Sequence, residues 1–229
     1  QPDLGSCIIL GVVMVSLMFV AGTTLKHIGL LTIVGVPAMA GVILSSEERM
    51  NRIFAWLSPE VYRYGDGYQL TQSTISIGSG QFLGPGPGSG AQNIAGYVPE
   101  SETDFIFSVI SEELGFIGSM LVILAFAYIL YAGFRLAMQV RDDFARYLAF
   151  GVTLLVVIQA AINIGVTTGT LPTKGLTLPF VSMGGSSMVV MAACVGILLN
   201  ISRSLPRYVR VPHSKESDET VSVFVKEAA

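Results

Sequence analysis

The sequence predicts an all-α polytopic membrane protein, built as one bundle of about six transmembrane helices with a large extracytoplasmic loop. Of its 229 residues, 52% are hydrophobic and only 13% are charged, whereas a soluble domain carries about 25% charge. The apolar residues are grouped in long runs, and the mean hydropathy is +0.65. A net charge of -3 argues against a nucleic-acid partner, because a phosphate-binding surface is basic.

Six segments are predicted to span the membrane, since about 20 apolar residues cross a hydrocarbon core of about 30 Å. They are residues 7–21, 28–44, 68–80, 105–130, 148–166 and 187–201. Residues 68–80 are the weakest of the six, because Gln69, Gln72, Ser73 and Ser76 share one helical face. In lipid, such a face has to point into the protein or into a wet cavity. The alternative is an amphipathic helix on the membrane surface.

The basic residues predict the orientation. With a cytoplasmic N-terminus and six alternating crossings, eleven of the thirteen Lys and Arg residues lie in the cytoplasm, and only Lys26 and Lys174 lie outside. Arg49, Arg52 and Arg63 are cytoplasmic in this scheme. The loop of residues 84–104 then faces outward. Residues 1–203 would form the transmembrane core, and residues 204–229 a disordered cytoplasmic tail.

Acidic residues at the end of the outward loop are the first candidates for chemistry. Ser101 and Asp104 precede an apolar run with the spacing of a capping box, which places an acid in the first helical turn. A carboxylate fixed in this way could also act as a base, and Glu100 and Glu102 lie beside it. Glu112 follows about 12 Å further along the same helix face. Pairing with a neighbouring helix and a catalytic role are both open for Glu112.

A second outward loop contributes a cation. Pro172 and Gly175 interrupt helicity there, and Lys174 between them is a candidate phosphate ligand. The alternative is a lysine at the membrane interface whose stem lies in lipid. Ser186 and Ser187 follow in a run of small residues at the start of the last span. Free backbone N–H groups there could bind an anion, or the small residues could simply allow close helix packing.

Nine short motifs run in a fixed order along the chain. They lie in residues 1–5, 67–73, 99–107, 112–115, 163–165, 171–172, 178–180, 184–187 and 199–203. In this order they resemble the SEDS family (shape, elongation, division and sporulation) of bacterial peptidoglycan polymerases. Residues 172–177 resemble the division-type branch, FtsW, more than the elongation-type branch, RodA. The chain departs from the common family pattern at Glu102, Met183 and Asn93, where His, Tyr and Lys are frequent.

The resemblance implies a multi-pass protein of the bacterial inner (plasma) membrane with ten transmembrane helices. This chain would contain the last six of them, and its start at Gln1, without Met or a signal peptide, leads us to expect that the N-terminal helices are missing. The family's essential outward-facing aspartate corresponds to Asp104. The implied partners are a class B penicillin-binding protein, other division proteins and membrane lipid.

The implied substrate is lipid II, an undecaprenyl-diphosphate-linked disaccharide-pentapeptide that the enzyme polymerises into glycan strands during cell division. Such a glycosyl transfer needs a carboxylate to remove a hydroxyl proton, for which Asp104 is the candidate. It also needs cations, or a divalent metal such as Mg or Mn, to stabilise the leaving diphosphate. The candidate substrate-binding residues are Gln69, Gln72, Glu100, Lys174, Ser186 and Ser187.

Two other functions fit the same sequence features. A lipid II flippase would use the polar helix face and the acids as a transport path without making a bond. A division scaffold would recruit other proteins, with catalysis elsewhere. Labelled lipid II given to the purified full-length protein separates these functions, because only an enzyme produces glycan polymer.

Overall fold

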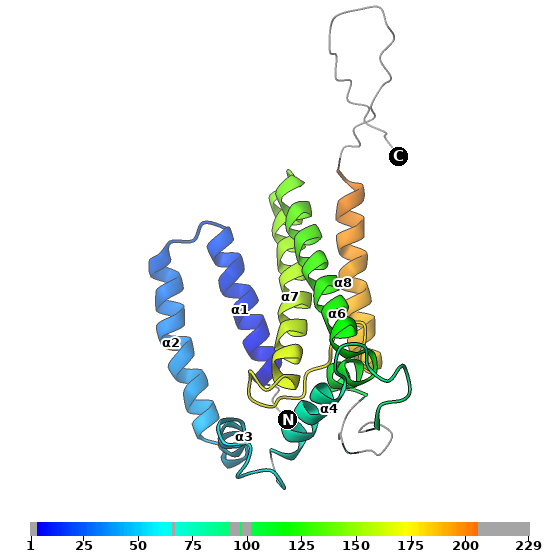
Figure 1. The fold of residues 1–229 in the computed structure, drawn as a ribbon. Helices are drawn as coiled ribbons and strands as arrows, with labels where there is room; N and C mark the ends of the chain where they lie inside the picture. Colours follow the sequence, from blue (N-terminus) through cyan, green and yellow to red (C-terminus); the bar gives the residue numbers. More distant parts are fainter. Residues whose placement is uncertain (1–3, 66, 92–96, 98–101, 206–229) are drawn as a thin grey trace, which may run out of the picture.

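The computed structural model describes residues 4–65, 67–91, 97 and 102–205, and this part of the chain consists of helices joined by loops, without a strand (Figure 1). Four helices are long and apolar enough to cross a membrane. They are α2 (Leu25–Leu44), α6 (Ile106–Gln139), α7 (Asp143–Thr167) and α8 (Gly185–Arg203). The apolar helix α1 (Leu4–Val20) is shorter, at 17 residues. The prediction of an all-α polytopic membrane protein is confirmed.

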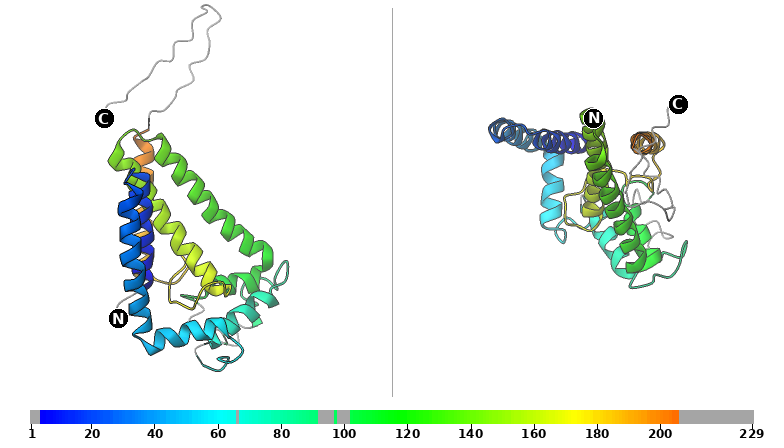
Figure 2. Two further views of the ribbon diagram at one scale, coloured as in Figure 1. Left: turned by 90° about the vertical axis from the view of Figure 1, so that its left-hand side faces the viewer. Right: turned by 90° about the horizontal axis from the view of Figure 1, so that it is seen from above.

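Helix α7 is the centre of the bundle. In the most apolar stretch of α7, half of the residues are buried, whereas in the most apolar stretch of α2 none are buried. Figures 1 and 2 show α2 at the edge of the molecule. The largest core cluster joins α6, α7 and α8 through Phe107, Phe126, Val156, Met191 and Leu178 of the α7–α8 loop. The helices α3 (Glu47–Leu57) and α4 (Tyr68–Ser79) lie across one end of the bundle (Figure 2). We call this end, together with residues 80–91 and 168–184, the cap.

Helix α4 does not cross the membrane, so the predicted span at residues 68–80 is wrong. Its 12 residues extend only about 18 Å at the usual helical rise, well short of the hydrocarbon core. Its polar face docks on the bundle instead. Ser73 Oγ donates to the Thr167 carbonyl (2.8 Å) and Ser76 Oγ to Glu112 Oε2 (2.8 Å), and both serines are fully buried. The two serines of this face therefore point into the protein, as one of the predicted alternatives required, while Gln69 at the start of the helix lines a pocket.

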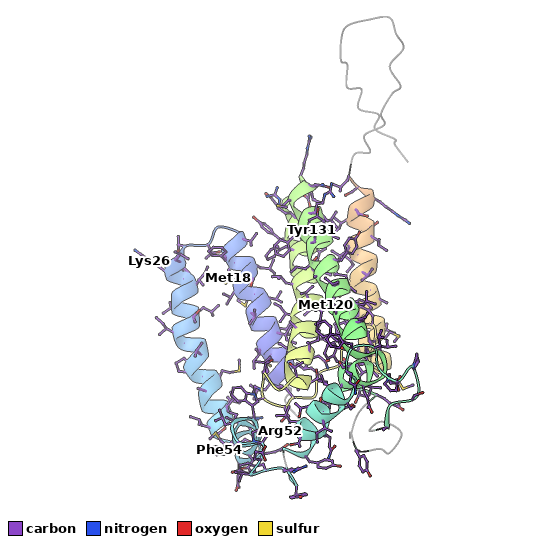
Figure 3. All side chains as sticks on the ribbon, viewed as in Figure 1. Met18, Lys26, Arg52, Phe54, Met120 and Tyr131 are labelled. Atoms are coloured by element: carbon purple, nitrogen blue, oxygen red, sulfur yellow. The ribbon has the colours of Figure 1, made fainter. Side chains whose placement is uncertain are left out.

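The loss of one crossing also changes which basic residues share an end of the molecule. Figure 3 shows Arg52 at the cap and Lys26 at the opposite end, where the α6–α7 turn lies. The prediction that separated Arg49 and Arg52 from Lys174 is wrong, because these three side chains line one pocket. The error arose because alternation counted a crossing that the chain does not make. In the described residues, Lys26 shares its end with the Arg141 turn, contrary to the prediction.

Helix α6 is interrupted at Gly115, which adopts φ 65° and ψ -161°. A Cβ at this position would lie 2.6 Å from Gly84 N, so a glycine is required for the close approach of residues 82–84. The backbone donor of Phe116 that the break frees binds the Gln81 carbonyl (2.9 Å). The first turns of α6, before the break, thus pack with the cap. Glu112 lies before this break and pairs with Ser76 of α4, which is one of the two alternatives that the sequence left open.

Helix α8 ends at Arg203. Residues 206–229 lie outside the described residues, so the disordered cytoplasmic tail remains a prediction.

Candidate active site

Asp104 lines a pocket of about 420 Å³ in the cap, a size within the usual range for ligand sites. The other lining residues come from α3, the α3–α4 loop, the start of α4, the N-cap of α6 and the α7–α8 loop. They are Arg52, Gly65, Tyr68, Gln69, Phe105, Thr173, Lys174 and Gly175. The structure therefore brings together three residues that the sequence analysis selected separately, namely Asp104, Gln69 and Lys174. We call this cavity the Asp104 pocket.

The backbone that carries Asp104 is held by side chains and amides from other parts of the chain. Three hydrogen bonds run from Met183 N to the Glu102 carbonyl (2.9 Å), from Ser182 Oγ to the Thr103 carbonyl (2.5 Å) and from Asn163 Nδ2 to the Asp104 carbonyl (2.8 Å). Helix α6 begins only at Ile106, with Phe105 at the N-cap position. The capping-box prediction is therefore wrong, because Asp104 precedes the helix and does not lie in its first turn.

Asn163 joins the two loops that form the site. Its side chain is almost completely buried on α7, and the same Nδ2 that binds the Asp104 carbonyl also donates to the Leu176 carbonyl (2.5 Å). One turn earlier, Gln159 Nε2 donates to the Thr177 carbonyl (3.0 Å). The central helix thus fixes the segment of Asp104 and the loop of Lys174 relative to each other.

Gly175 allows the Asp104 carboxylate to lie directly against the α7–α8 loop. A Cβ built at Gly175 would be 2.7 Å from Asp104 Oδ2, closer than real side-chain contacts allow. Gly175 is not one of the glycines with a positive φ. Its role is therefore to leave space for the carboxylate and not to adopt an unusual backbone conformation. Any larger residue would have to displace the carboxylate.

The charges of the pocket are mixed, with one carboxylate, Asp104, and two cations, Arg52 and Lys174. Arg52 Nη2 bonds Glu48 Oε1 at 2.7 Å, and both side chains of this pair are largely exposed. Such exposed pairs contribute only about 0–1 kcal/mol, so an anionic ligand could exchange for Glu48 at little cost. A carboxylate beside two cations suits a reaction that removes a proton and releases an anion.

Arg52 was missed in the sequence analysis because it was assigned to the other side of the membrane. The signal that points to it is the segment around it. Arg49 and Arg52 are three residues apart on an amphipathic helix of 11 residues, which is too short to cross and follows a span directly. Such a helix lies at the membrane surface on the side where that span ends.

Other predicted site residues do not line the Asp104 pocket. Ser187 Oγ lies 3.0 Å from Thr177 Oγ1, so it supports the α7–α8 loop, while Ser186 is exposed at the start of α8. Gln72 is half-buried on α4. Glu100 lies outside the described residues. Where the chain is described, no three His, Cys, Asp or Glu side chains gather as a metal site, so a divalent ion remains a prediction.

Comparison with known proteins gives consistent similarities over almost the whole chain. The profile of the FtsW/RodA/SpoVE family, described as "Cell cycle protein", matches residues 1–206. The stage V sporulation protein E of Bacillus subtilis is 42% identical over 203 residues, which are 89% of this chain and 55% of that protein. A "Probable peptidoglycan glycosyltransferase FtsW" of Trichlorobacter lovleyi is 45% identical over 205 residues, 90% of this chain and 54% of that protein. The chain thus spans about half the length of these relatives.

Two solved structures share the fold. One, described as "Structural coordination of polymerization and crosslinking by a peptidoglycan synthase complex", matches with a TM-score of 0.67 at 27% identity, over 89% of this chain and 56% of that chain. A mutant of the Thermus thermophilus rod shape determining protein RodA matches with a TM-score of 0.57 at 25% identity, over 90% of this chain and 51% of that chain.

Proposed function

Because the chain belongs to the FtsW/RodA/SpoVE family of cell cycle proteins, we propose that it carries the active site of a peptidoglycan glycosyltransferase that polymerises lipid II. The observation that carries this proposal is the Asp104 carboxylate in one pocket with Arg52 and Lys174. Relatives named as probable peptidoglycan glycosyltransferases, at 45% and 43% identity, support the reaction class. The proposal concerns the whole protein, because the relatives are about twice as long as this chain.

In the proposed reaction, the 4-hydroxyl of an acceptor GlcNAc attacks the anomeric carbon of the donor MurNAc. The new glycosidic C–O bond forms as the C–O bond to the diphosphate breaks, and the undecaprenyl diphosphate leaves with the bonding electron pair. Asp104 accepts the hydroxyl proton. The positive charges of Arg52 and Lys174 stabilise the negative charge that develops on the leaving diphosphate.

The remaining residues of the pocket have supporting roles in this proposal. The Gln69 amide can donate to and accept from sugar hydroxyls, and Asn163 and Gly175 fix the position of Asp104. We retain a Mg or Mn ion as a proposal. Such an ion is typically held through one or two carboxylates together with substrate phosphates, and Asp104 beside a diphosphate would fit this pattern. It would supply further positive charge at the leaving group.

We also propose that the cap faces outward from the bacterial inner membrane and that the α6–α7 turn is cytoplasmic. Among the described residues, five basic residues lie at the end opposite the cap, namely Lys26, Arg135, Arg141, Arg146 and Arg203, and four lie at the cap, namely Arg49, Arg52, Arg63 and Lys174. The excess on cytoplasmic ends that is typical of membrane proteins is thus one residue here, and the orientation rests mainly on the outward-facing aspartate that the family resemblance implies. The partner would be a cross-linking enzyme of the class B penicillin-binding proteins, with other division proteins. A solved complex described as coordinating polymerization and crosslinking supports this. Residues 172–177, which resemble the division-type branch more than the elongation-type branch, favour a division role over an elongation role.

The experiment that tests the proposal is Asp104→Asn in the full-length protein, assayed for glycan polymer from labelled lipid II. The substitution keeps the size of the side chain and removes the base, so polymerisation should fall by about 10²–10⁴. Glu102→Gln is the matched control, because Glu102 is exposed on the same segment and should retain near-normal activity. Near-normal polymer from Asp104→Asn would exclude Asp104 as the base. Transport of lipid II without any polymer from the wild type would instead indicate a flippase.

A further inference from the structure

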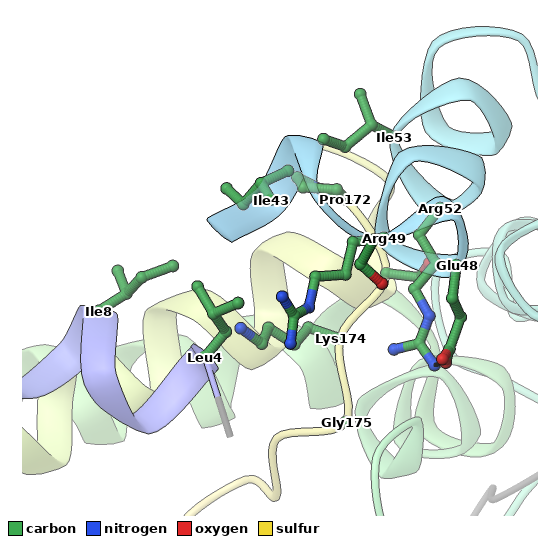
Figure 4. Close-up of a pocket in the computed structure, with 12 residues that line it drawn as sticks. Leu4, Ile8, Ile43, Glu48, Arg49, Arg52, Ile53, Pro172, Lys174 and Gly175 are labelled. Carbon is green, nitrogen blue, oxygen red and sulfur yellow. Dashed lines mark hydrogen bonds and ion pairs between the residues drawn. The ribbon is translucent and has the colours of Figure 1, made fainter. Parts of the chain in front are cut away.

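A second pocket of about 420 Å³ adjoins the Asp104 pocket and has two chemically different walls. One wall is apolar and comes from α1, α2 and α3, with Leu4, Ile8, Ile43 and Ile53. The other carries charge, with Arg49, Arg52, Lys174 and Glu48. Figure 4 shows Arg49 and Lys174 pointing into the same space, between Leu4 and the start of α3. We call this cavity the amphiphilic pocket.

The two pockets share the residues that lie between them. Arg52, Thr173, Lys174 and Gly175 line both, whereas Asp104 lines only the first and Leu4, Ile8 and Ile43 only the second. From the first pocket to the second, the Asp104 carboxylate is therefore followed by the cations Arg52 and Lys174 and then by the apolar wall. A lipid-linked sugar donor has the same order of parts: the anomeric carbon that reacts, then the diphosphate, then the isoprenoid chain.

We propose that the amphiphilic pocket binds the donor substrate, with its diphosphate on Arg52, Arg49 and Lys174 and the first part of its lipid chain against Leu4, Ile8 and Ile43. This inference rests on the proposed function and adds the binding residues and the direction of the donor. In this arrangement the donor's lipid chain extends out of the pocket beside α1 and α2. The acceptor then enters from the side of Tyr68 and Gln69.

The charge of the pocket fits a diphosphate diester. Three cations and one carboxylate line it, giving a formal charge of +2, and the diester carries about two negative charges. Arginine binds phosphate oxygens through two parallel N–H donors, which a lysine cannot do. Arg49 and Arg52, three residues apart, project from neighbouring positions on α3.

The two arginines differ in what they already hold. Arg49 Nη1 donates to the Val42 carbonyl at 2.6 Å, one of the last carbonyls of α2, so it also stabilises the end of that helix. Arg52 pairs only with exposed Glu48 among the bonds described for it. A substitution of Arg52 therefore tests ligand binding without removing a hydrogen bond that stabilises α2.

The position of Arg52 depends on the next turn of α3. Trp56 Nε1 donates to the Gly169 carbonyl at 2.9 Å, and the neighbouring Ala55 is buried. These contacts dock α3 on the α7–α8 loop, which carries Lys174. Cations from two segments more than a hundred residues apart are thereby held at one site, at the level where α1 begins and α2 ends (Figure 1).

The test measures equilibrium binding of undecaprenyl diphosphate to the full-length protein in nanodiscs of phosphatidylcholine. Arg52→Ala should weaken binding about 10- to 100-fold, the range expected for losing a charge-assisted hydrogen bond, and Arg52→Lys should weaken it less. Arg63→Ala is the matched control, because Arg63 lies in the cap but lines neither pocket, and it should change binding less than about twofold. Ile43→Ser should weaken binding of undecaprenyl diphosphate but not of inorganic diphosphate.

Two results would overturn the inference. One is binding by Arg52→Ala that equals binding by Arg63→Ala. The other is competition by phosphatidylglycerol as strong as that by undecaprenyl diphosphate, which would make the pocket an ordinary headgroup site. If Arg52→Ala lowers the melting temperature, Arg52→Gln, which keeps a long polar side chain, replaces it. Measured in EDTA, where no divalent ion can link Asp104 to the ligand, Asp104→Asn should bind the diphosphate normally, so a failure of the proposed catalysis and a failure of this site give different results.

Discussion

Replacing Gly175 by alanine should reduce catalysis without reducing stability. The added Cβ would lie 2.7 Å from Asp104 Oδ2, whereas ordinary contacts begin at 3.4 Å. The carboxylate therefore has to move by about 0.7 Å, the difference between these two distances. A misplacement of about 1 Å at a reacting group can cost about 10²-fold in rate, so we expect polymerisation to fall by about 10- to 100-fold. Gly175 itself is exposed, and surface substitutions usually change stability by less than about 0.5 kcal/mol.

The assay compares polymerisation of labelled lipid II with thermal unfolding, both on the full-length protein. Gly185→Ala is the control, because a Cβ there meets no atom within 4 Å and its φ is not positive; it should leave both measurements unchanged. If Gly175→Ala polymerises as fast as the wild type, the position of the Asp104 carboxylate does not limit the rate, and the close contact has no catalytic meaning. If it unfolds at a clearly lower temperature, the loss of activity cannot be assigned to the carboxylate.

Two further predictions concern the support of the site and the topology. Asn163→Ala removes the donor to two backbone carbonyls and should destabilise the protein by about 2–4 kcal/mol as well as slow polymerisation; Gln159→Ala, which leaves the Asp104 segment untouched, should be milder in both, and equal effects would contradict the bridging role. In cells whose protein lacks Cys7 and Cys194, a cysteine at Ser89 should react with an impermeant reagent before lysis and one at Lys26 only after it. Labelling of both before lysis would support the six-crossing topology instead.

The sequence was sufficient wherever a segment's structure depends on its own composition. The runs that became α1, α2, α7 and α8 were located because a long apolar run has few alternatives to a helix in a membrane. Helix α4 was misassigned because its partners, Thr167 and Glu112, are 94 and 36 residues away from the serines that bind them. The break at Gly115 depends likewise on residues 81–84, which no local pattern connects to it.

The same distinction applies to the site. Asp104, Lys174 and Gln69 were selected from motifs, and the fold places them in one pocket. Arg52 was separated from Lys174 because topology was inferred by alternation, a procedure in which one false crossing places all earlier segments on the wrong side relative to all later ones. The serines at the start of α8 were selected for a property of helix N-termini in general, while the actual contact of Ser187 is with Thr177. Backbone anion sites need the three-dimensional position of a ligand, which a run of small residues does not encode.

The two halves of the site are held by different elements, and this makes their functions separable. Asp104 is positioned by α7, through Asn163, and by the turn that includes Ser182. Arg52 is positioned by α3, through the Trp56 bond to Gly169. Gly175→Ala should therefore slow the chemical step while diphosphate binding is kept, and substitutions at Arg52 should weaken binding while the carboxylate stays in place. Asn163→Ala should slow the chemical step and weaken diphosphate binding less than Arg52→Ala does, because Asn163 also binds the Leu176 carbonyl in the Lys174 loop. A variant of Asn163 that lost diphosphate binding as strongly as Arg52→Ala would show that the two halves move as one unit, since the α7–α8 loop, which holds Lys174 and receives Trp56, is the segment they share.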